Sequence, residues 1–296
     1  MHPNTKIVHK TIFFFIFLIS NLLFSQSEIE IIGVKYTITT QNKYYNNVYS
    51  SNNNKLDAFV NYGHDLGKEN KLFYHISYHN FDINTVINND ELVIDDSTYY
   101  SNIPSFSFVD FATGMTNKFS KNWSLTNIIN LTITDDFNDG ILQSHHYFRT
   151  FSYLKKKKTK NLNYGFGVYL SKLNNDLSIY PILSLRLKNS KRGMKLFLPR
   201  ELKFWNKINS KSYIELKTIL NSNYLKFDNS ALNIELLSIN SELTYNYIYK
   251  NKLKLKTGFG LPYTQYKYTF KADCINTSQL NLSFTIGLSY VVFKNE

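Results

Sequence analysis

Cysteine, glycine and proline are all scarce in this chain of 296 residues, which contains 1 Cys, 11 Gly and 5 Pro. The lone Cys274 cannot form a disulfide within the chain, and no cluster of cysteines and histidines offers the ligands of a structural zinc site. After Gln26 no run of ~18 apolar residues occurs, which excludes an α-helical membrane protein. Aromatic residues are abundant instead, at 16% of the chain, so an intrinsically disordered protein is also excluded. We expect no metal and no cofactor.

The first 25 residues have the order of a secretory signal peptide. Lys6 and Lys10 precede an apolar block from Thr11 to Phe24, and Ser25 and Gln26 follow at a plausible cleavage site. This block is shorter than the ~20 residues that a membrane-spanning helix needs, so an uncleaved anchor is the weaker alternative. We therefore expect a signal peptide at residues 1–25 and one exported domain at residues 26–296.

The remaining chain shows alternation with a period of two, which is typical of β-strands with one apolar and one polar face. In the last such segment, apolar residues from Leu280 to Val292 alternate with polar or small residues from Asn281 to Ser289. Thirteen segments are predicted as strands: 31–41, 55–65, 71–82, 104–117, 122–134, 144–154, 161–172, 178–188, 193–206, 212–225, 231–249, 252–263 and 279–293.

Two architectures place an apolar face and a polar face on every strand. A soluble β-sandwich turns the apolar face to its core, whereas an outer-membrane barrel turns it to lipid and lines its lumen with the polar face. The segments are longer than the 5–6 residues usual in globular proteins. Tyrosines such as Tyr44, Tyr99, Tyr247 and Tyr263 lie near segment ends, where barrels carry aromatic girdles. These features favour an all-β fold, a transmembrane antiparallel up-and-down β-barrel in the cell outer membrane. An exported soluble β-sandwich that binds a ligand remains the alternative.

The strand count must differ from thirteen, because a bacterial single-chain barrel has an even number of strands. Either segment 193–206, which Pro199 interrupts, is not one full strand, or Gln265 to Lys271 is a further strand. The sequence therefore predicts about 12 strands, with 14 possible.

His75, Ser77 and His79 share the polar face of one segment, so the barrel model places them together in the lumen. A lipid hydrolase would need a serine activated by a neighbouring histidine. Residues two apart on a strand lie about 6 to 7 Å apart, which predicts no direct hydrogen bond among these three unless their rotamers are unusual. No Gly-x-Ser-x-Gly motif occurs either. We predict polar lumen residues and no enzyme, with an outer-membrane lipid hydrolase as an alternative.

Basic residues also recur on polar faces and predict a positively biased lumen. Such an interior would favour small anionic or polar solutes. The candidate pore-lining residues are Arg186, Lys188, Lys217, Lys254 and Lys256.

The densest run of charge is Lys155 to Lys160, which contains five lysines. Such a run can bind nucleic acid, but export makes that partner unsuitable. A solvated strand connection near lipid headgroups explains the run better. The expected partners are therefore outer-membrane lipids and the barrel-assembly machinery, with no nucleic acid.

The chain resembles an outer-membrane β-barrel family of unknown function found in Gram-negative bacteria. The resemblance rests on Phe24-Ser25-Gln26, on the segment from Lys195 to Phe204 around Leu198-Pro199-Arg200, and on the closing strand that ends at Phe293. It implies location and architecture, and it carries no catalytic residues. Together with the basic polar faces, it predicts a passive porin-like channel or a structural membrane component.

Overall fold

The computed structural model describes residues 28–40, 42–43, 50–67, 69–85, 106–135, 145–173, 176–226, 232–270 and 273–293. The expected signal peptide at residues 1–25 lies outside these residues. The described chain is all β. Its strands are β1 Glu28–Thr39, β2 Asn42–Lys43, β3 Ser50–Leu66, β4 Asn70–Thr85, β5 Phe106–Lys118, β6 Trp123–Asp135, β7 His145–Lys157, β8 Leu162–Leu173, β9 Asp176–Lys188, β10 Arg192–Leu198, β11 Glu201–Lys207, β12 Ser212–Lys226, β13 Leu232–Tyr249, β14 Leu253–Phe270, β15 Asp273–Leu280 and β16 Ser283–Phe293.

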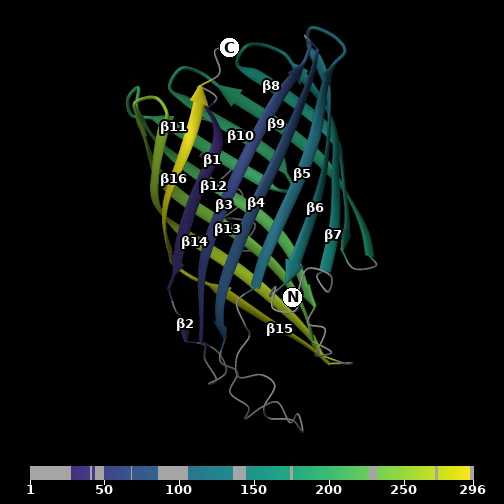
Figure 1. Cartoon of the computed structure of the whole chain (residues 1–296), viewed down its shortest axis with the longest axis vertical. Coiled ribbons are helices and arrows are strands. Elements are labelled where there is room, and N and C mark those ends of the chain that lie inside the picture. The colour runs from purple at the N-terminus through teal and green to yellow at the C-terminus, as the bar shows by residue number, and fades with distance from the viewer. Residues whose placement is uncertain are drawn as a thin grey trace, which may run out of the picture.

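The strands form one closed antiparallel barrel (Figure 1). Neighbours in sequence pair with each other, and β1 closes the sheet by pairing with both β16 and β3. Strand β2 pairs with β3 beyond the end of β1, and β15 pairs with β14 beyond the end of β16. Because β1 and β2 share one position around the barrel, as do β15 and β16, the wall has fourteen strands. Fourteen is the upper of the two predicted counts.

The structure answers the question of the strand count differently for the two uncertain segments. Segment 193–206 is not one strand, because the chain turns at Pro199 and returns, so that β10 pairs with β11 through Leu196↔Leu202 and its neighbours. Gln265 to Phe270 is strand, as one alternative held, but it continues β14 and adds no wall position. The fourteenth strand therefore comes from dividing segment 193–206.

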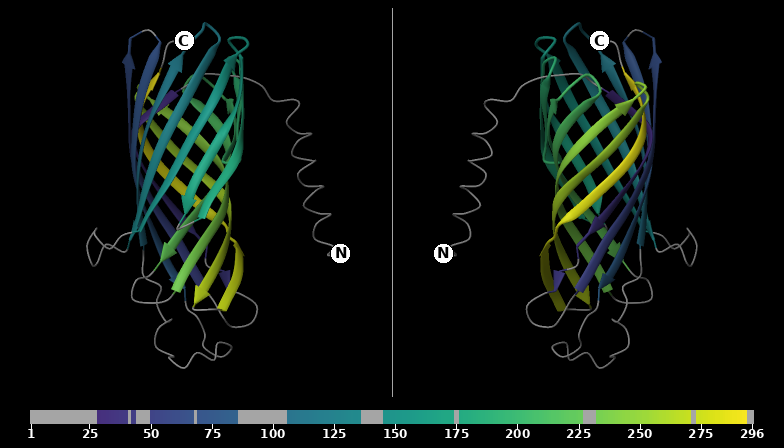
Figure 2. Two further views of the ribbon diagram at one scale, coloured as in Figure 1. Left: turned by 90° about the vertical axis from the view of Figure 1, so that its right-hand side faces the viewer. Right: turned by 90° about the vertical axis from the view of Figure 1, so that its left-hand side faces the viewer.

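The two ends of the barrel differ in the length of their connections. The C-terminal end of β16 lies at the end with short turns, at the top of Figure 1, and the side views show the same grouping (Figure 2). At that end Lys250 and Asn251 join β13 to β14 with φ values of 48° and 56°, and the Lys252 amide donates to the Tyr249 carbonyl. Two successive left-handed residues are the geometry of a tight hairpin turn. In outer-membrane barrels the short turns face the periplasm.

The alternation of side chains sorts the wall into two faces. Large apolar side chains point outward, with 71% of Phe259 and 57% of Ile286 exposed. Polar neighbours point inward, where Thr285 is 1% and Lys254 2% exposed. An apolar outer wall around a polar interior is the inverse of a water-soluble protein and matches the lipid-facing wall of an outer-membrane barrel. The β-sandwich alternative is therefore wrong, and the chain is an outer-membrane β-barrel.

Candidate functional site: the charged lumen

The barrel encloses a cavity of about 620 Å³, and charged side chains from β1, β3, β5, β7 and β10 to β14 are part of its lining. Nine of the described lining residues are Lys or Arg and six are Asp or Glu, which leaves an excess of three positive charges with the histidines neutral. The basic residues are Lys35, Lys55, Arg149, Lys195, Arg200, Lys203, Lys217, Lys254 and Lys256. The acidic residues are Glu30, Asp57, Asp110, Glu201, Glu215 and Glu242.

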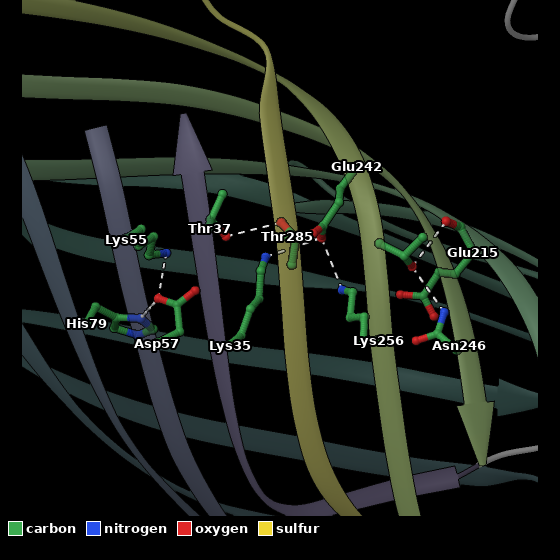
Figure 3. Close-up of polar contacts among 11 residues, drawn as sticks. Lys35, Thr37, Lys55, Asp57, His79, Glu215, Glu242, Asn246, Lys256 and Thr285 are labelled. Atoms are coloured by element: carbon green, nitrogen blue, oxygen red, sulfur yellow. Dashed lines mark hydrogen bonds and ion pairs between the residues drawn. The ribbon is translucent and has the colours of Figure 1, made fainter. Parts of the chain in front are cut away.

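Ion pairs join strands within this lumen. Glu242 on β13 accepts from Lys35 on β1 at 3.2 Å and from Lys256 on β14 at 3.0 Å (Figure 3). Lys254 on β14 pairs with Glu30 on β1 at 2.6 Å. The Lys35–Glu242 and Lys254–Glu30 contacts pass over β16, which lies between β14 and β1. Their carboxylates and ammonium groups therefore alternate around the wall and do not form a ring of one sign.

The structure separates the five basic residues that the sequence singled out. Lys217, Lys254 and Lys256 line the cavity. Arg186 and Lys188 lie on the part of β9 nearest the short turns, where Lys188 is buried and Arg186 is opposite Lys195 of β10. Neither Arg186 nor Lys188 is among the residues lining this cavity. Their pore-lining role stays a prediction.

Sequence reasoning missed the six carboxylates and most of the other cations. A signal was present for some of them, since Glu215 occupies an alternate position on the same face as Lys217. The partners of these carboxylates lie far away in sequence, as Lys35 and Glu242 do, and only the closed barrel brings them together.

His75, Ser77 and His79 lie together on the lumen side of β4, as predicted, but the predicted absence of hydrogen bonds is wrong. His75 Nε2 and His79 Nε2 each lie 3.0 Å from Ser77 Oγ. The imidazole rings lean along the strand and cover the distance between alternate Cα atoms, which the spacing argument treated as fixed. His79 Nδ1 is also 2.5 Å from Asp57 Oδ1, while His75 Nδ1 is 2.6 Å from Asn61 Oδ1.

Asp57, His79 and Ser77 thus have the connectivity of a serine hydrolase triad. A second carboxylate complicates this reading, because His79 Nε2 also lies 3.3 Å from Asp110 Oδ2. A general base must accept the serine proton at Nε2, whereas a carboxylate at that nitrogen favours donation from it. The backbone of β4 is paired with β3 and β5 on both sides, so its amides do not form an oxyanion hole at Ser77. His79 is therefore placed to hold two carboxylates together.

Two other features are absent from the described residues, a metal-binding cluster and a membrane-spanning helix. No group of three or more His, Cys, Asp or Glu in this part of the chain is arranged to bind a metal ion. The same residues include no helix with the length and apolar character needed to cross a membrane.

Comparison with known proteins returns only structural likeness. No family model and no curated protein matches the chain. Similar solved structures include the NanC porin, with a TM-score of 0.39 and 9% identity over 89% of this chain and all of that one. The Pseudomonas putida toluene transporter TodX has a TM-score of 0.37 and 11% identity over 93% of this chain and 92% of its own. LpxR from Salmonella typhimurium has a TM-score of 0.33 and 8% identity over 86% and 99%.

Proposed function

We propose that the chain is a passive channel that admits small anionic solutes across the outer membrane. The observation that carries the proposal is the cavity of about 620 Å³ with nine cations and six carboxylates in its lining. Charged side chains that line a pore select permeating ions by sign. The interleaved carboxylates weaken the field of the lysines, so we expect a moderate preference for anions rather than exclusion of cations.

Reversal potentials in a planar bilayer with a KCl gradient test this proposal. We expect the sign of an anion-preferring pore, and we expect Lys217→Gln to reduce the preference because it removes one lumen cation. Lys211→Gln is the matched control, since Lys211 lies in the exposed turn between β11 and β12. A cation-preferring pore, or a barrel without conductance, would contradict the proposal.

The second candidate is a hydrolase, favoured by the hydrogen bonds from Asp57 through His79 to Ser77. The position of Asp110 beside His79 Nε2 argues against it, so we propose that the chain is not an enzyme. Release of p-nitrophenol from p-nitrophenyl butyrate is the assay. We expect the same rate from the unaltered chain, from Ser77→Ala and from buffer with detergent. A rate that Ser77→Ala abolishes would establish the hydrolase instead.

A further inference from the structure

Five basic residues lie in one continuous row across neighbouring strands of the wall. Strands β7 to β12 are consecutive neighbours, and each residue of the row is directly opposite the next one in the register of the sheet (Figure 1). We call this row, with the asparagine that it includes, the basic row. Its residues are Lys157 on β7, Asn163 on β8, Arg186 on β9, Lys195 on β10, Lys203 on β11 and Lys217 on β12. Directly opposed residues share one face of a sheet, and three members of the row, Lys195, Lys203 and Lys217, line the lumen cavity.

The basic row rises from the rim with the short turns into the barrel. Lys157 is the last residue of β7, Arg186 lies two residues inside the end of β9, and Lys217 lies five residues inside the start of β12. With neighbouring strands about 4.8 Å apart, the steps from β7 to β12 span about 24 Å. The next residue in register is Glu242 on β13, where the series of cations ends. The row therefore joins the rim to the lumen cavity.

The part of the basic row near the rim has further cations beside it. Lys155 on β7 and Lys188 on β9 each lie two residues from the member of the row on their strand, so they share its face. The strands β7, β8 and β9 together contain one carboxylate, Asp176, which lies at the opposite end of β9. The positive charge near the rim is therefore not balanced by carboxylates of the same strands.

Carboxylates reach the basic row farther inside the barrel. Lys195 pairs with Glu201 at 2.6 Å, and Lys203 pairs with Glu215 at 2.6 Å. Arg186 is nevertheless directly opposite Lys195, which in turn is opposite Lys203. Like charges in directly opposed positions destabilise a sheet. An anion lying along the row would reduce this repulsion, so the arrangement favours a negatively charged ligand.

The lysine run of the sequence supplies the first member of the basic row. Lys155 to Lys157 belong to β7, and only the rest of the run lies in the turn to β8. Side chains alternate along a strand, so Lys157 shares the face of the row while Lys156 lies on the other face. The Lys156 ammonium is 4.9 Å from the centre of the Trp123 ring. One strand end therefore carries two neighbouring cations, one in the row and one outside it.

We propose that the basic row binds a linear chain of phosphate groups, as in inorganic polyphosphate, and guides it between the rim and the lumen. A single phosphate contacts one or two cations of the row. A flexible chain contacts several at once, and linked contacts raise affinity through their effective concentration. Passage of the chain rests on the proposed anion channel, whereas binding needs the row alone.

The spacing of the cations favours phosphate chains over acidic peptides. In an extended peptide, carboxylates on one face recur at every second residue, or about 6.8 Å, whereas the cations of neighbouring strands are about 4.8 Å apart. A polyphosphate carries charge on every unit and is not restricted to one face, so an anion is available at each cation. Lysine binds phosphate as a point charge, which tolerates a variable position of the chain.

Isothermal titration calorimetry with the barrel in detergent micelles tests binding, with polyphosphate long enough to span about 24 Å as the ligand. We expect polyphosphate to bind at least about tenfold more tightly than pyrophosphate, because it makes more linked contacts. The affinity should also fall steeply with salt. Five cations predict a slope of about −3.5 for log K against log[KCl], at about −0.7 per cation as for single-stranded nucleic acids. Equal affinities for the two ligands would overturn the proposal.

Lys157→Gln and Arg186→Gln test the part of the row outside the lumen cavity. Each should weaken polyphosphate binding about fivefold and make the salt slope shallower by about 0.7, because one cation contact is lost. Lys156→Gln is the matched control, since it removes the same charge from the same strand end on the other face. It should leave the affinity and the slope unchanged. Equal losses for Lys156→Gln and Lys157→Gln would show that no row is involved and would overturn the proposal.

Two further measurements separate this proposal from its alternatives. Oligoglutamate of matching length should bind more weakly than polyphosphate, and tighter binding of oligoglutamate would overturn the choice of a phosphate chain. In planar bilayers polyphosphate should reduce the KCl current, and the reduction should be smaller in Arg186→Gln. An anion-preferring pore that does not bind polyphosphate would contradict the basic row alone. A barrel that binds polyphosphate but carries no current would contradict the channel alone.

Discussion

Replacing Glu242 by glutamine removes the carboxylate that links β1 to β14 across the lumen face of β16. Two ammonium groups, on Lys35 and Lys256, lose their common partner at 3.2 and 3.0 Å. A hydrogen bond to a charged group contributes about 1.5–3 kcal/mol net, and a solvent-exposed ion pair about 0–1 kcal/mol. The Glu242 side chain is only 12% exposed, whereas that of Lys35 is 29% exposed. We therefore expect Glu242→Gln to lower the free energy of unfolding by about 2 kcal/mol, between these limits.

Unfolding in urea with the barrel in detergent micelles measures this difference, because folded and unfolded barrels migrate differently in gels run without boiling. Lys35→Gln leaves the pair between Glu242 and Lys256 intact, so it should cost about half as much. The double variant Glu242→Gln/Lys35→Gln should lose less stability than the two single variants together, since the residues are in contact. A cost below about 0.5 kcal/mol for Glu242→Gln would refute the reasoning and indicate a lumen in which water screens the pairs completely.

Three further substitutions test the wall and the lumen. Ile286→Lys puts a charge on the lipid-facing side of β16 and should lower the free energy of unfolding by about 2–4 kcal/mol near the bilayer midplane. Asn221→Lys puts the same charge on the lumen face and should fold normally. An equal loss of stability for both variants in urea unfolding would contradict the assigned faces. Gly167→Ala should destabilise the barrel by about 1–3 kcal/mol, because a Cβ there would lie 2.1 Å from the Ser152 carbonyl oxygen, while Gly63→Ala, with no atom nearer than 3.8 Å, should be neutral in the same assay. Glu215→Gln raises the positive excess of the cavity and should increase the anion preference in reversal potentials, and a decrease would argue against a pore controlled by lumen charge.

The period-two pattern was sufficient to predict the wall, because lipid requires an apolar outer face on every strand. Phe284, Ile286 and Leu288 all face outward as the alternation indicated, and Ser77 faces inward with His75 and His79. The division at Pro199 could not be predicted by pattern alone. Leu196, Leu202 and Phe204 continue the apolar series on both sides of the turn, and no Asn-Gly or Asp-Gly pair marks the hairpin.

The ion pairs inside the lumen could not be predicted from the sequence, for a geometric reason. Whether Lys254 meets Glu30, or Lys35 meets Glu242, depends on the closure and stagger of the whole barrel, which relate residues more than 200 positions apart. The contact between Ser77 and the two histidines was local, but it depended on rotamers that a Cα spacing does not specify.

The pairing of Glu28 with Phe293 places the first and last described residues of the barrel side by side. The strands consequently form a continuous ring, and the chain termini could be moved to another connection between strands. A short peptide joining the two ends would allow new termini to be opened in a connection at the opposite rim, giving a circular permutant with every strand contact retained. Such a permutant would present its termini to the cell exterior, which makes that rim a natural position for attaching a displayed domain.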